Sequence, residues 1–231
     1  MKSLFNYLLK FLRNLAVGDY RSKKLSNLIV EKIISYNKKK KTIRILDYGS
    51  GYQPRLIFFV ENKLREKYKK KLVIDCYDYY KKKEIKELNE YYNNRINFHH
   101  VNSLKKYKKR YDFSLLCDVI HHIGIHKEKL IINLINNLTK KTKIVFIKDH
   151  FQTGKISNTI IRTMDFLGNY FNNVDIPMLY FSKKSFNSLM KKTNSKTIFE
   201  LDSIQLYPIY LLFMSNPKFN FVRLVKKFRK K

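Results

Sequence analysis

The chain has 231 residues, which suits one domain with a full hydrophobic core, and 44% of its residues are apolar. This apolar content excludes a disordered chain, and no apolar run reaches the roughly 20 residues that would span a bilayer. The start of the chain lacks the small-residue cleavage site of a secretory signal, so we expect a cytoplasmic protein. Cys76 and Cys117 lie in apolar runs, and we expect buried free thiols rather than a disulfide.

The chain is strongly basic, with 49 Lys and Arg residues against 18 Asp and Glu residues and a formal net charge of +31. A cationic surface favours phosphate, so RNA and an anionic membrane surface are the first partners to weigh. Lys, Asn, Ile and Tyr are abundant whereas alanine occurs once, a bias typical of AT-rich coding sequences. Part of the positive charge therefore follows from composition, although acidic or phosphorylated partners stay favoured.

The first 41 residues predict two helices and a basic linker. Residues 2–16 place apolar side chains at helical spacing, with basic and amide side chains mostly opposite them. Such an amphipathic helix either packs on the domain or lies peripherally on membrane headgroups. A second helix is expected over residues 22–36, followed by a run of lysines at 38–41.

From Ile43 onward, strands and helices are expected to alternate. The opening strand ends at Asp47, and further strands are expected over 71–77, 96–101, 111–117 and 143–147, with helices over 55–70, 82–92 and 127–138. This alternation predicts an α/β fold, because parallel strands need crossover connections and these are usually helical. We therefore expect a parallel sheet with helices on both faces.

The last third of the chain departs from simple alternation. The pattern indicates a helix over 156–167, a loop over 169–180 and a helix over 183–192 that Ser182 caps. Two strands are expected over 197–206 and 210–214, and residues 219–231 are interpreted as a basic amphipathic tail.

Polar residues and glycines stand where the predicted parallel strands end, and ligands of open α/β sheets bind at that edge. Asp47 precedes Gly49 and Gly51 after the first strand, and Asp78, Asn102 and Asp118 follow the next three strands. Glycines let the backbone approach a ligand closely, and an acid after the second strand can accept both hydrogen bonds of a ribose diol. A nucleotide-like ligand fits this set.

The glycine pattern is not that of a dinucleotide-binding loop. Pro54 stands where the third glycine of that loop would be, and proline suits a first helical turn instead. Asp47 would repel a pyrophosphate. A cationic ligand, such as an amino-acid ammonium or a sulfonium, is favoured.

Three stretches resemble motifs of class I S-adenosylmethionine-dependent methyltransferases: ILDYGSG at 45–51, YDFSLLCDVIHHI at 111–123 and IKDH at 147–150. The segments at 164–169 and 177–181 are similar to a bacterial small-molecule subgroup of that family. The resemblance implies a Rossmann-like three-layer sandwich, with a mostly parallel seven-stranded sheet and an antiparallel strand near the C-terminus. It also implies a single methyltransferase domain, made of N-terminal helices (1–41), a cofactor-binding core (42–150), a substrate-side cover (151–195) and last strands with a basic tail (196–231).

The resemblance further implies that S-adenosylmethionine is the cofactor. Asp47 would orient the loop, and Gly49, Ser50 and Gly51 would line the methionine part of the cofactor. The remaining cofactor contacts implied are Asp78 at the ribose, Tyr79 at the adenine, Asn102 at the adenine amine, and Asp118. Asp75 is a rival to Asp78, but it lies within the predicted strand rather than at its end.

A general base is needed only if the methyl acceptor must lose a proton. The candidates are His121, His122, Asp149 and His150, all predicted at the carboxyl ends of the fourth and fifth strands. Each of them could instead cap a helix or satisfy a buried neighbour.

Two further pairs lie four residues apart. Asp165 and Asn169 are expected to face the substrate or, alternatively, to terminate a helix. His122 and His126 could share a helix face and suggest a metal, but Gly124 weakens that helix and no third ligand has suitable spacing. We therefore predict no metal.

The leading functional hypothesis is a methyltransferase for a small-molecule or lipid- or sugar-linked acceptor. An RNA methyltransferase is second, because the charge favours it but no RNA-binding module is recognisable. A membrane-surface binding protein with a degenerate fold is the third alternative, suggested by the basic amphipathic ends.

Overall fold

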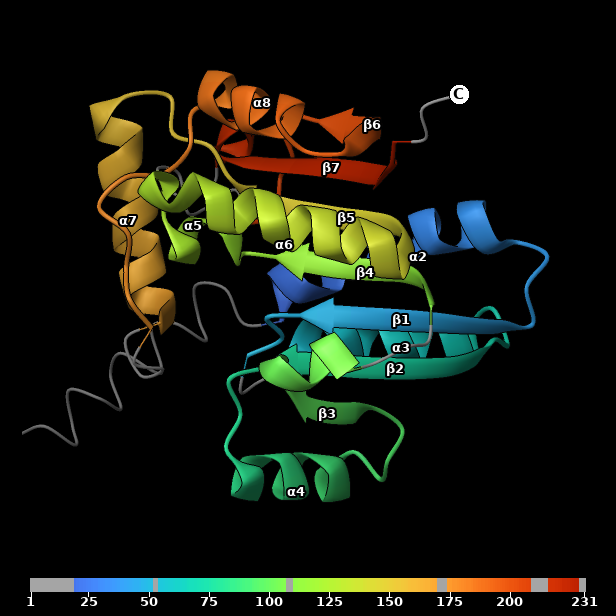
Figure 1. Ribbon diagram of the computed structural model, residues 1–231. Helices are drawn as coiled ribbons and strands as arrows, with labels where there is room; N and C mark the ends of the chain where they lie inside the picture. The colour runs from blue at the N-terminus through green and yellow to red at the C-terminus, as the bar shows by residue number, and fades with distance from the viewer. Residues whose placement is uncertain (1–18, 52–53, 107–109, 170–173, 209–215, 229–231) are drawn as a thin grey trace, which may run out of the picture.

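The computed structural model describes residues 19–51, 54–106, 110–169, 174–208 and 216–228. Within these residues seven strands form one sheet in the order β3-β2-β1-β4-β5-β7-β6. The strands β1 to β5 are parallel to one another, whereas β7 runs antiparallel to both β5 and β6. Figure 1 shows α6 in front of this sheet and α2 and α3 behind it. This is the expected three-layer α/β architecture.

The bounds of the elements follow the predicted alternation closely. The strands are β1 (Thr42–Tyr48), β2 (Lys71–Asp78), β3 (Asn97–His100), β4 (Tyr111–Cys117), β5 (Thr142–His150), β6 (Ser195–Leu201) and β7 (Asn220–Lys227). The helices are α2 (Tyr20–Asn37), α3 (Arg55–Glu66), α4 (Lys82–Tyr91), α5 (Ile120–Ile123), α6 (Glu128–Lys141), α7 (Lys155–Asn169) and α8 (Lys183–Lys191). Short 3-10 turns cover Val101–Lys106, Ile125–Lys127 and Pro217–Phe219.

The central strands are buried on both faces, which explains their nearly continuous apolar sequences. Because side chains alternate along a strand, neighbours on β1 enter different cores. Ile45 packs with Ile29 of α2 and Ile57 of α3 on one face of the sheet. Leu46 packs on the opposite face in the cluster that contains Ile131 of α6. The two apolar cores thus fix the sheet between its helical layers.

Local signals account for several of the element ends. Ser182 caps α8 as predicted, since its Oγ accepts a hydrogen bond from the backbone N–H of Ser185 at 3.1 Å. The helix α3 ends at Glu66, before the predicted end at 70, and Lys69 follows with a left-handed φ of +49° that turns the chain into β2. Cys76 and Cys117 are free thiols; Cys76 is buried as expected, whereas Cys117 is only partly buried.

The C-terminal prediction is wrong for residues 220–227. This segment is not a basic amphipathic tail but the strand β7, which lies between β5 and β6. Four of its apolar side chains are fully buried, and its central Arg223 is 1% exposed and ion-paired with Asp202 and with Glu200. Two acids thus neutralise a charge that suggested a solvated tail. The strand expected over 197–206 ends at Leu201.

Two other predicted elements, the helix over 2–16 and the strand over 210–214, lie outside the described residues. Of the helices that the structure describes, none is both long and apolar enough to cross a bilayer.

Leu224 offers a direct test of the buried position of β7. We expect Leu224→Ala to lower the free energy of unfolding by about 2–5 kcal/mol, because it leaves a cavity beside a fully buried strand. Lys226→Ala, two residues further on an exposed position, should change it by less than about 0.5 kcal/mol. Urea unfolding of both variants measures the difference, and equal small effects would contradict an internal strand.

Candidate functional site

The candidate site lies where the parallel strands β1, β2, β4 and β5 end. Figure 1 shows α7 standing across this edge, crosswise to the strands, while the other long helices run along the sheet. Most of the polar residues singled out in the sequence end or follow these strands or β3, and Asp165 and Asn169 lie on α7, so the fold brings them to the same edge of the molecule.

The turn after β1 needs both of its glycines, for different reasons. Gly49 has a φ of +78°, and a Cβ built on it would lie 2.3 Å from Cγ2 of Val119. Gly51 has a φ of +69° but open space around it, and its N–H donates to the Asp78 carboxylate at 2.7 Å. Gly49 is thus held by a close approach within the chain, whereas Gly51 leaves room beside the loop.

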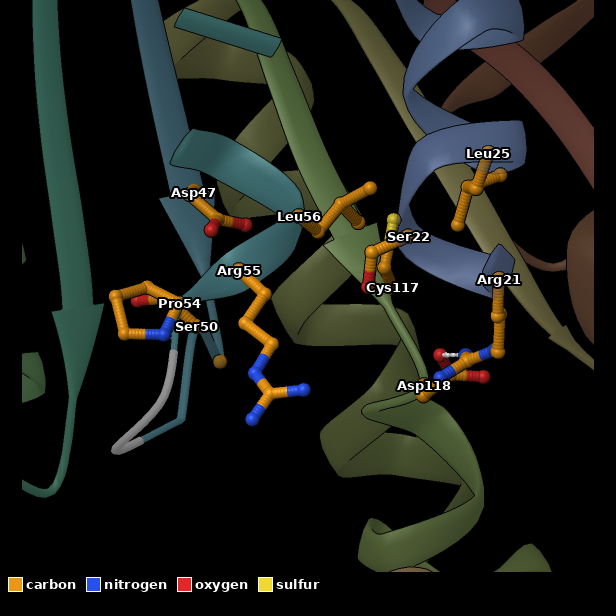
Figure 2. Close-up of a pocket in the computed structure, with 11 residues that line it drawn as sticks. Arg21, Ser22, Leu25, Asp47, Ser50, Pro54, Arg55, Leu56, Cys117 and Asp118 are labelled. Carbon is orange, nitrogen blue, oxygen red and sulfur yellow. Dashed lines mark hydrogen bonds and ion pairs between the residues drawn. The ribbon is translucent and has the colours of Figure 1, made fainter. Parts of the chain in front are cut away.

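A cavity of about 190 Å³ opens beside this turn (Figure 2). Four of the predicted cofactor residues line it: Asp47, Gly49, Ser50 and Asp118. The rest of the wall comes from Arg21, Ser22, Leu25, Pro54, Arg55, Leu56 and Cys117. The cavity therefore lies between the glycine turn, the N-terminal ends of α2 and α3, and the end of β4.

The Asp47 carboxylate is the least compensated charge in this cavity. Its residue is 5% exposed, and no group among the described residues donates a hydrogen bond to it. Burial, and secondarily the negative charge of Asp78, raise its pKa to about 7. Figure 2 shows Asp47 on the opposite side of the cavity from the Arg21–Asp118 ion pair. A cationic ligand group beside Asp47 would supply the missing partner.

The other predicted cofactor residues lie outside the cavity wall, around the ends of β2 and β3. Asp78 ends β2, and its two carboxylate oxygens accept from the N–H groups of Gly51 and Tyr79, each at 2.7 Å. Tyr79 is 73% exposed and stands edge-on to the His100 ring at 6.1 Å. Asn102 is also exposed, and its N–H donates to His100 Nδ1 at 3.2 Å. Asp78, Tyr79 and Asn102 thus form an exposed surface next to the cavity, called the open ledge below.

Asp75, the rival for the ribose-binding position, is engaged inside the sheet. It is buried, accepts from Tyr111 Oη at 2.9 Å and lies 3.1 Å from His99 Nε2. These contacts outweigh burial and hold the pKa of Asp75 below its usual value. Asp75 has a structural position, as expected from its place within the strand.

The four catalytic candidates form one cluster. His121 Nδ1 donates to Asp149 at 2.6 Å, and the His121 ring lies 4.0 Å from the ring of His122 and 5.5 Å from that of His150. Asp149 also accepts from the backbone N–H groups of Ile120 and His150, at 2.9 and 2.7 Å. Asp149 therefore fixes the start of α5 against β5 and orients His121.

The predicted substrate residues on α7 join the same cluster. Asp165 lies 3.5 Å from His121 Nε2 and 3.9 Å from His122 Nε2. Asn169 donates to its Oδ1 at 2.6 Å and Tyr180 to its Oδ2 at 2.7 Å. Asp165 thus faces the histidines, and Asn169 supports it.

The protonation states differ among the three histidines. For His121, burial disfavours the charged form, but Asp149 and Asp165 outweigh it and raise the pKa to about 9. Burial and the nearby His121 lower the pKa of His122. Burial and then Lys148 lower the pKa of His150 far below its ordinary value. Near neutral pH, His121 is cationic while His122 and His150 are neutral.

Two cations that the sequence did not single out surround Asp118. Arg21 of α2 is ion-paired with its carboxylate, and the fully buried Lys148 donates to it at 2.5 Å. Burial, followed by the charge of Arg21, lowers the pKa of Lys148. His150 Nε2 lies 3.2 Å from the same carboxylate, so Asp118 joins the cavity to the histidine cluster. The available signal for Lys148 was its position directly after the apolar run of residues 144–147 in β5, whereas Arg21 had no such signal.

No protein-family model and no curated protein sequence matches the chain. Solved structures do match it. An S-adenosylmethionine-dependent methyltransferase from Clostridium acetobutylicum is 12% identical and superposes with a TM-score of 0.60 over 98% of this chain and 100% of its own. The chain has the class I methyltransferase fold.

Two further structures share this methyltransferase fold. The 1,6-didemethyltoxoflavin-N1-methyltransferase of Burkholderia thailandensis, solved with 1,6-didemethyltoxoflavin and S-adenosylhomocysteine, is 14% identical with a TM-score of 0.54 over 91% of this chain and 80% of its own. An O-methyltransferase family 2 protein from Planctomyces limnophilus, solved with apigenin, is 12% identical with a TM-score of 0.55 over 89% and 61%. At these identities the likeness concerns the fold.

The raised pKa of Asp47 predicts a pH-dependent stability. The native carboxyl holds a proton up to about pH 7, whereas in the unfolded chain an aspartate releases it near about pH 3.9. The Asp47 carboxyl therefore lowers the free energy of unfolding of the protein as the pH rises from about 4 to 7, by up to about 4 kcal/mol. Asp47→Asn should remove this loss, so that its stability relative to the wild type is higher at pH 8 than at pH 5.

Urea unfolding of both proteins at the two pH values measures this difference. Glu66→Gln, which removes an exposed acid of α3, is the matched control and should keep the wild-type pH dependence. Parallel pH profiles for Asp47→Asn and the wild type would show that the Asp47 carboxylate is solvated or paired in solution.

Proposed function

We propose that the protein is an S-adenosylmethionine-dependent methyltransferase for a small-molecule or lipid- or sugar-linked acceptor. The observation that carries this proposal is the Asp47 carboxylate, which has no partner among the described residues and lies in a cavity beside the glycine turn of a methyltransferase fold. S-adenosylmethionine has two cationic groups at its methionine end, an ammonium and a sulfonium. Either one would compensate the buried carboxylate.

The rest of the cofactor would extend from the cavity along the open ledge. Asp78 already accepts one hydrogen bond at each oxygen, and each oxygen has a second lone pair for a ribose hydroxyl. Tyr79 offers an exposed ring for the adenine, and Asn102 offers an exposed amide beside it. Ser50 would line the loop, although its hydroxyl is within hydrogen-bonding distance of Tyr80 Oη at 3.0 Å.

The methyl acceptor would meet the cavity on the side of the histidine cluster, because Asp118 belongs to both. Methyl transfer is an in-line displacement, and the protein mainly supplies alignment and a suitable electrostatic field. Asp149, His121 and His150 are buried and hold one another, which suits positioning. The side chain of His122 is 21% exposed and is the member of the four that an acceptor would reach first.

A small acceptor is favoured over RNA or a membrane surface by two observations. The two neighbours solved with small molecules, apigenin and 1,6-didemethyltoxoflavin, have this fold. The basic amphipathic C-terminal tail that suggested membrane binding is not present at residues 220–225, because they form a buried strand. The assignment to the bacterial small-molecule subgroup stays a prediction.

Calorimetry with S-adenosylmethionine tests the proposal on the intact chain. We expect binding at pH 8, and Asp47→Asn should weaken it about tenfold or more, the usual loss when a charged hydrogen-bond partner is removed. Wild-type affinity should also fall between pH 8 and pH 6, as Asp47 takes up its proton. Glu66→Gln should bind like the wild type.

Titration with S-adenosylhomocysteine, which lacks the sulfonium charge, identifies the group that Asp47 faces. A similar loss for both ligands in Asp47→Asn points to the ammonium, whereas a larger loss for S-adenosylmethionine points to the sulfonium. A folded wild-type chain that binds neither ligand would disprove the proposed function.

A further inference from the structure

The atoms of His121, His122 and Asp165 that face one another can all be metal ligands. His121 is cationic near neutral pH in the absence of an ion, so a bound metal would displace the proton from its Nε2. His121 Nδ1 must donate to Asp149, because an ionised carboxylate only accepts, and this leaves Nε2 as the inward nitrogen. His122 Nδ1 likewise donates to the backbone carbonyl of Asp175 at 3.0 Å, which leaves its Nε2 inward as well. Both inward nitrogens approach the two oxygens of Asp165.

The spacing of these atoms fits ligands of one ion. His121 Nε2 lies 3.5 Å and His122 Nε2 lies 3.9 Å from the nearest Asp165 oxygen, and the three ligand atoms all lie within 4.8 Å of one another. A tetrahedral ion with bonds of about 2.0–2.2 Å would hold its ligand atoms slightly closer together than they lie here. Binding would therefore need only a small contraction of the cluster.

His121 Nε2 is the second, independent sign of a missing ligand. It is a buried polar atom with no hydrogen-bond partner in the part of the chain that the structure describes, on a side chain that is 1% exposed. Its contact with Asp165, at 3.5 Å, is an ion-pair distance rather than a hydrogen bond in this geometry. A buried polar atom without a partner is costly, so such an atom often marks the place of a water or an ion.

All three side chains are also held from outside, as metal ligands usually are. Asp149 orients His121, and the Asp175 carbonyl orients His122. The carboxylate of Asp165 is held by Asn169 at 2.6 Å and by Tyr180 at 2.7 Å. Each ligand atom is thus preset by an outer partner that does not occupy the centre.

The neighbouring set of Asp118, His121 and Asp149 is a weaker alternative, although its atoms also converge. Asp118 is already paired with Arg21 and Lys148, and Asp149 accepts four hydrogen bonds, three from backbone N–H groups and one from His121 Nδ1. Bound cations and donors leave little negative charge there for an ion.

We propose that His121, His122 and Asp165 form a site for a divalent transition-metal ion of the zinc type. Two imidazole nitrogens and one carboxylate favour zinc or its relatives over magnesium or calcium, which prefer all-oxygen ligands. Three protein ligands leave the fourth position of a tetrahedral ion open. The side chain of His122 is 21% exposed, so the open position would be available to an oxygen or nitrogen ligand from solvent.

The site corrects the basis on which a metal was discounted in the sequence. His122 and His126 do not share a helix, because α5 ends at Ile123 and Gly124 follows with a φ of +91°. The third ligand comes instead from Asp165, 43 positions after His122, and only the placement of α7 across the sheet edge brings it there. This site does not depend on the proposed methyl transfer.

Metal titration of the intact chain, free of any histidine tag and first treated with a chelator, tests the site without an activity assay. Co²⁺ serves as the probe because a tetrahedral site gives it an intense visible spectrum, and Zn²⁺ should displace it. We expect one Co²⁺ per chain and no competition by Mg²⁺. If neither Co²⁺ nor Zn²⁺ binds stoichiometrically, the proposal is wrong, and His121 carries a proton between these side chains instead.

Three variants locate the ion. His122→Ala and Asp165→Asn should each weaken Co²⁺ binding by at least about tenfold, which is the loss that even an outer-shell partner causes. His126→Ala, an exposed histidine four residues from His122, should bind like the wild type. Circular dichroism and urea unfolding confirm that each variant is folded. Unchanged Co²⁺ affinity in both ligand variants, or an equal loss in His126→Ala, would place the metal elsewhere and refute the site.

Discussion

The concentration of carboxylates at one edge of the sheet is the constraint on which the rest of the site depends. Parallel strands deliver Asp47, Asp118 and Asp149 to this edge, and α7 adds Asp165. Their mutual repulsion must be offset locally, and each acid is handled differently. Asp118 is paired with basic side chains, and Asp149 accepts several hydrogen bonds. Asp47 has no partner among the described residues. This unequal compensation divides the edge into a structural part and a part that can take a cation.

The sequence predicted those features that depend on neighbours along the chain. The strand ends at Asp47 and Asp78 follow from apolar runs that stop at an acid, and the turn after β1 follows from glycines two positions apart. Ser182 was readable as a cap because capping is local. The element order, and with it the methyltransferase fold, could be predicted from such signals because alternation restricts the possible topologies.

Contacts between residues that lie far apart in the sequence could not be predicted in the same way. His121 and Asp149 are 28 positions apart, and their bond requires that β4 and β5 be neighbours and in the observed register. Arg21 is one base among 49, so nothing in the sequence distinguishes its ion pair with Asp118. Arg223 misled for the opposite reason, since a charge in an apolar run indicates solvent until its acidic partners are known.

The contact between Gly49 and Val119 ties the glycine turn to the element that bears the histidines. Val119 directly precedes α5, and α5 contains His121 and His122. A side chain at position 49 would push on Val119 at 2.3 Å and shift the start of α5 even with no ligand bound. A defect caused by substitution at Gly49 therefore reports on the alignment of the histidines as well as on the loop, whereas Gly51, with open space around it, reports on the loop alone.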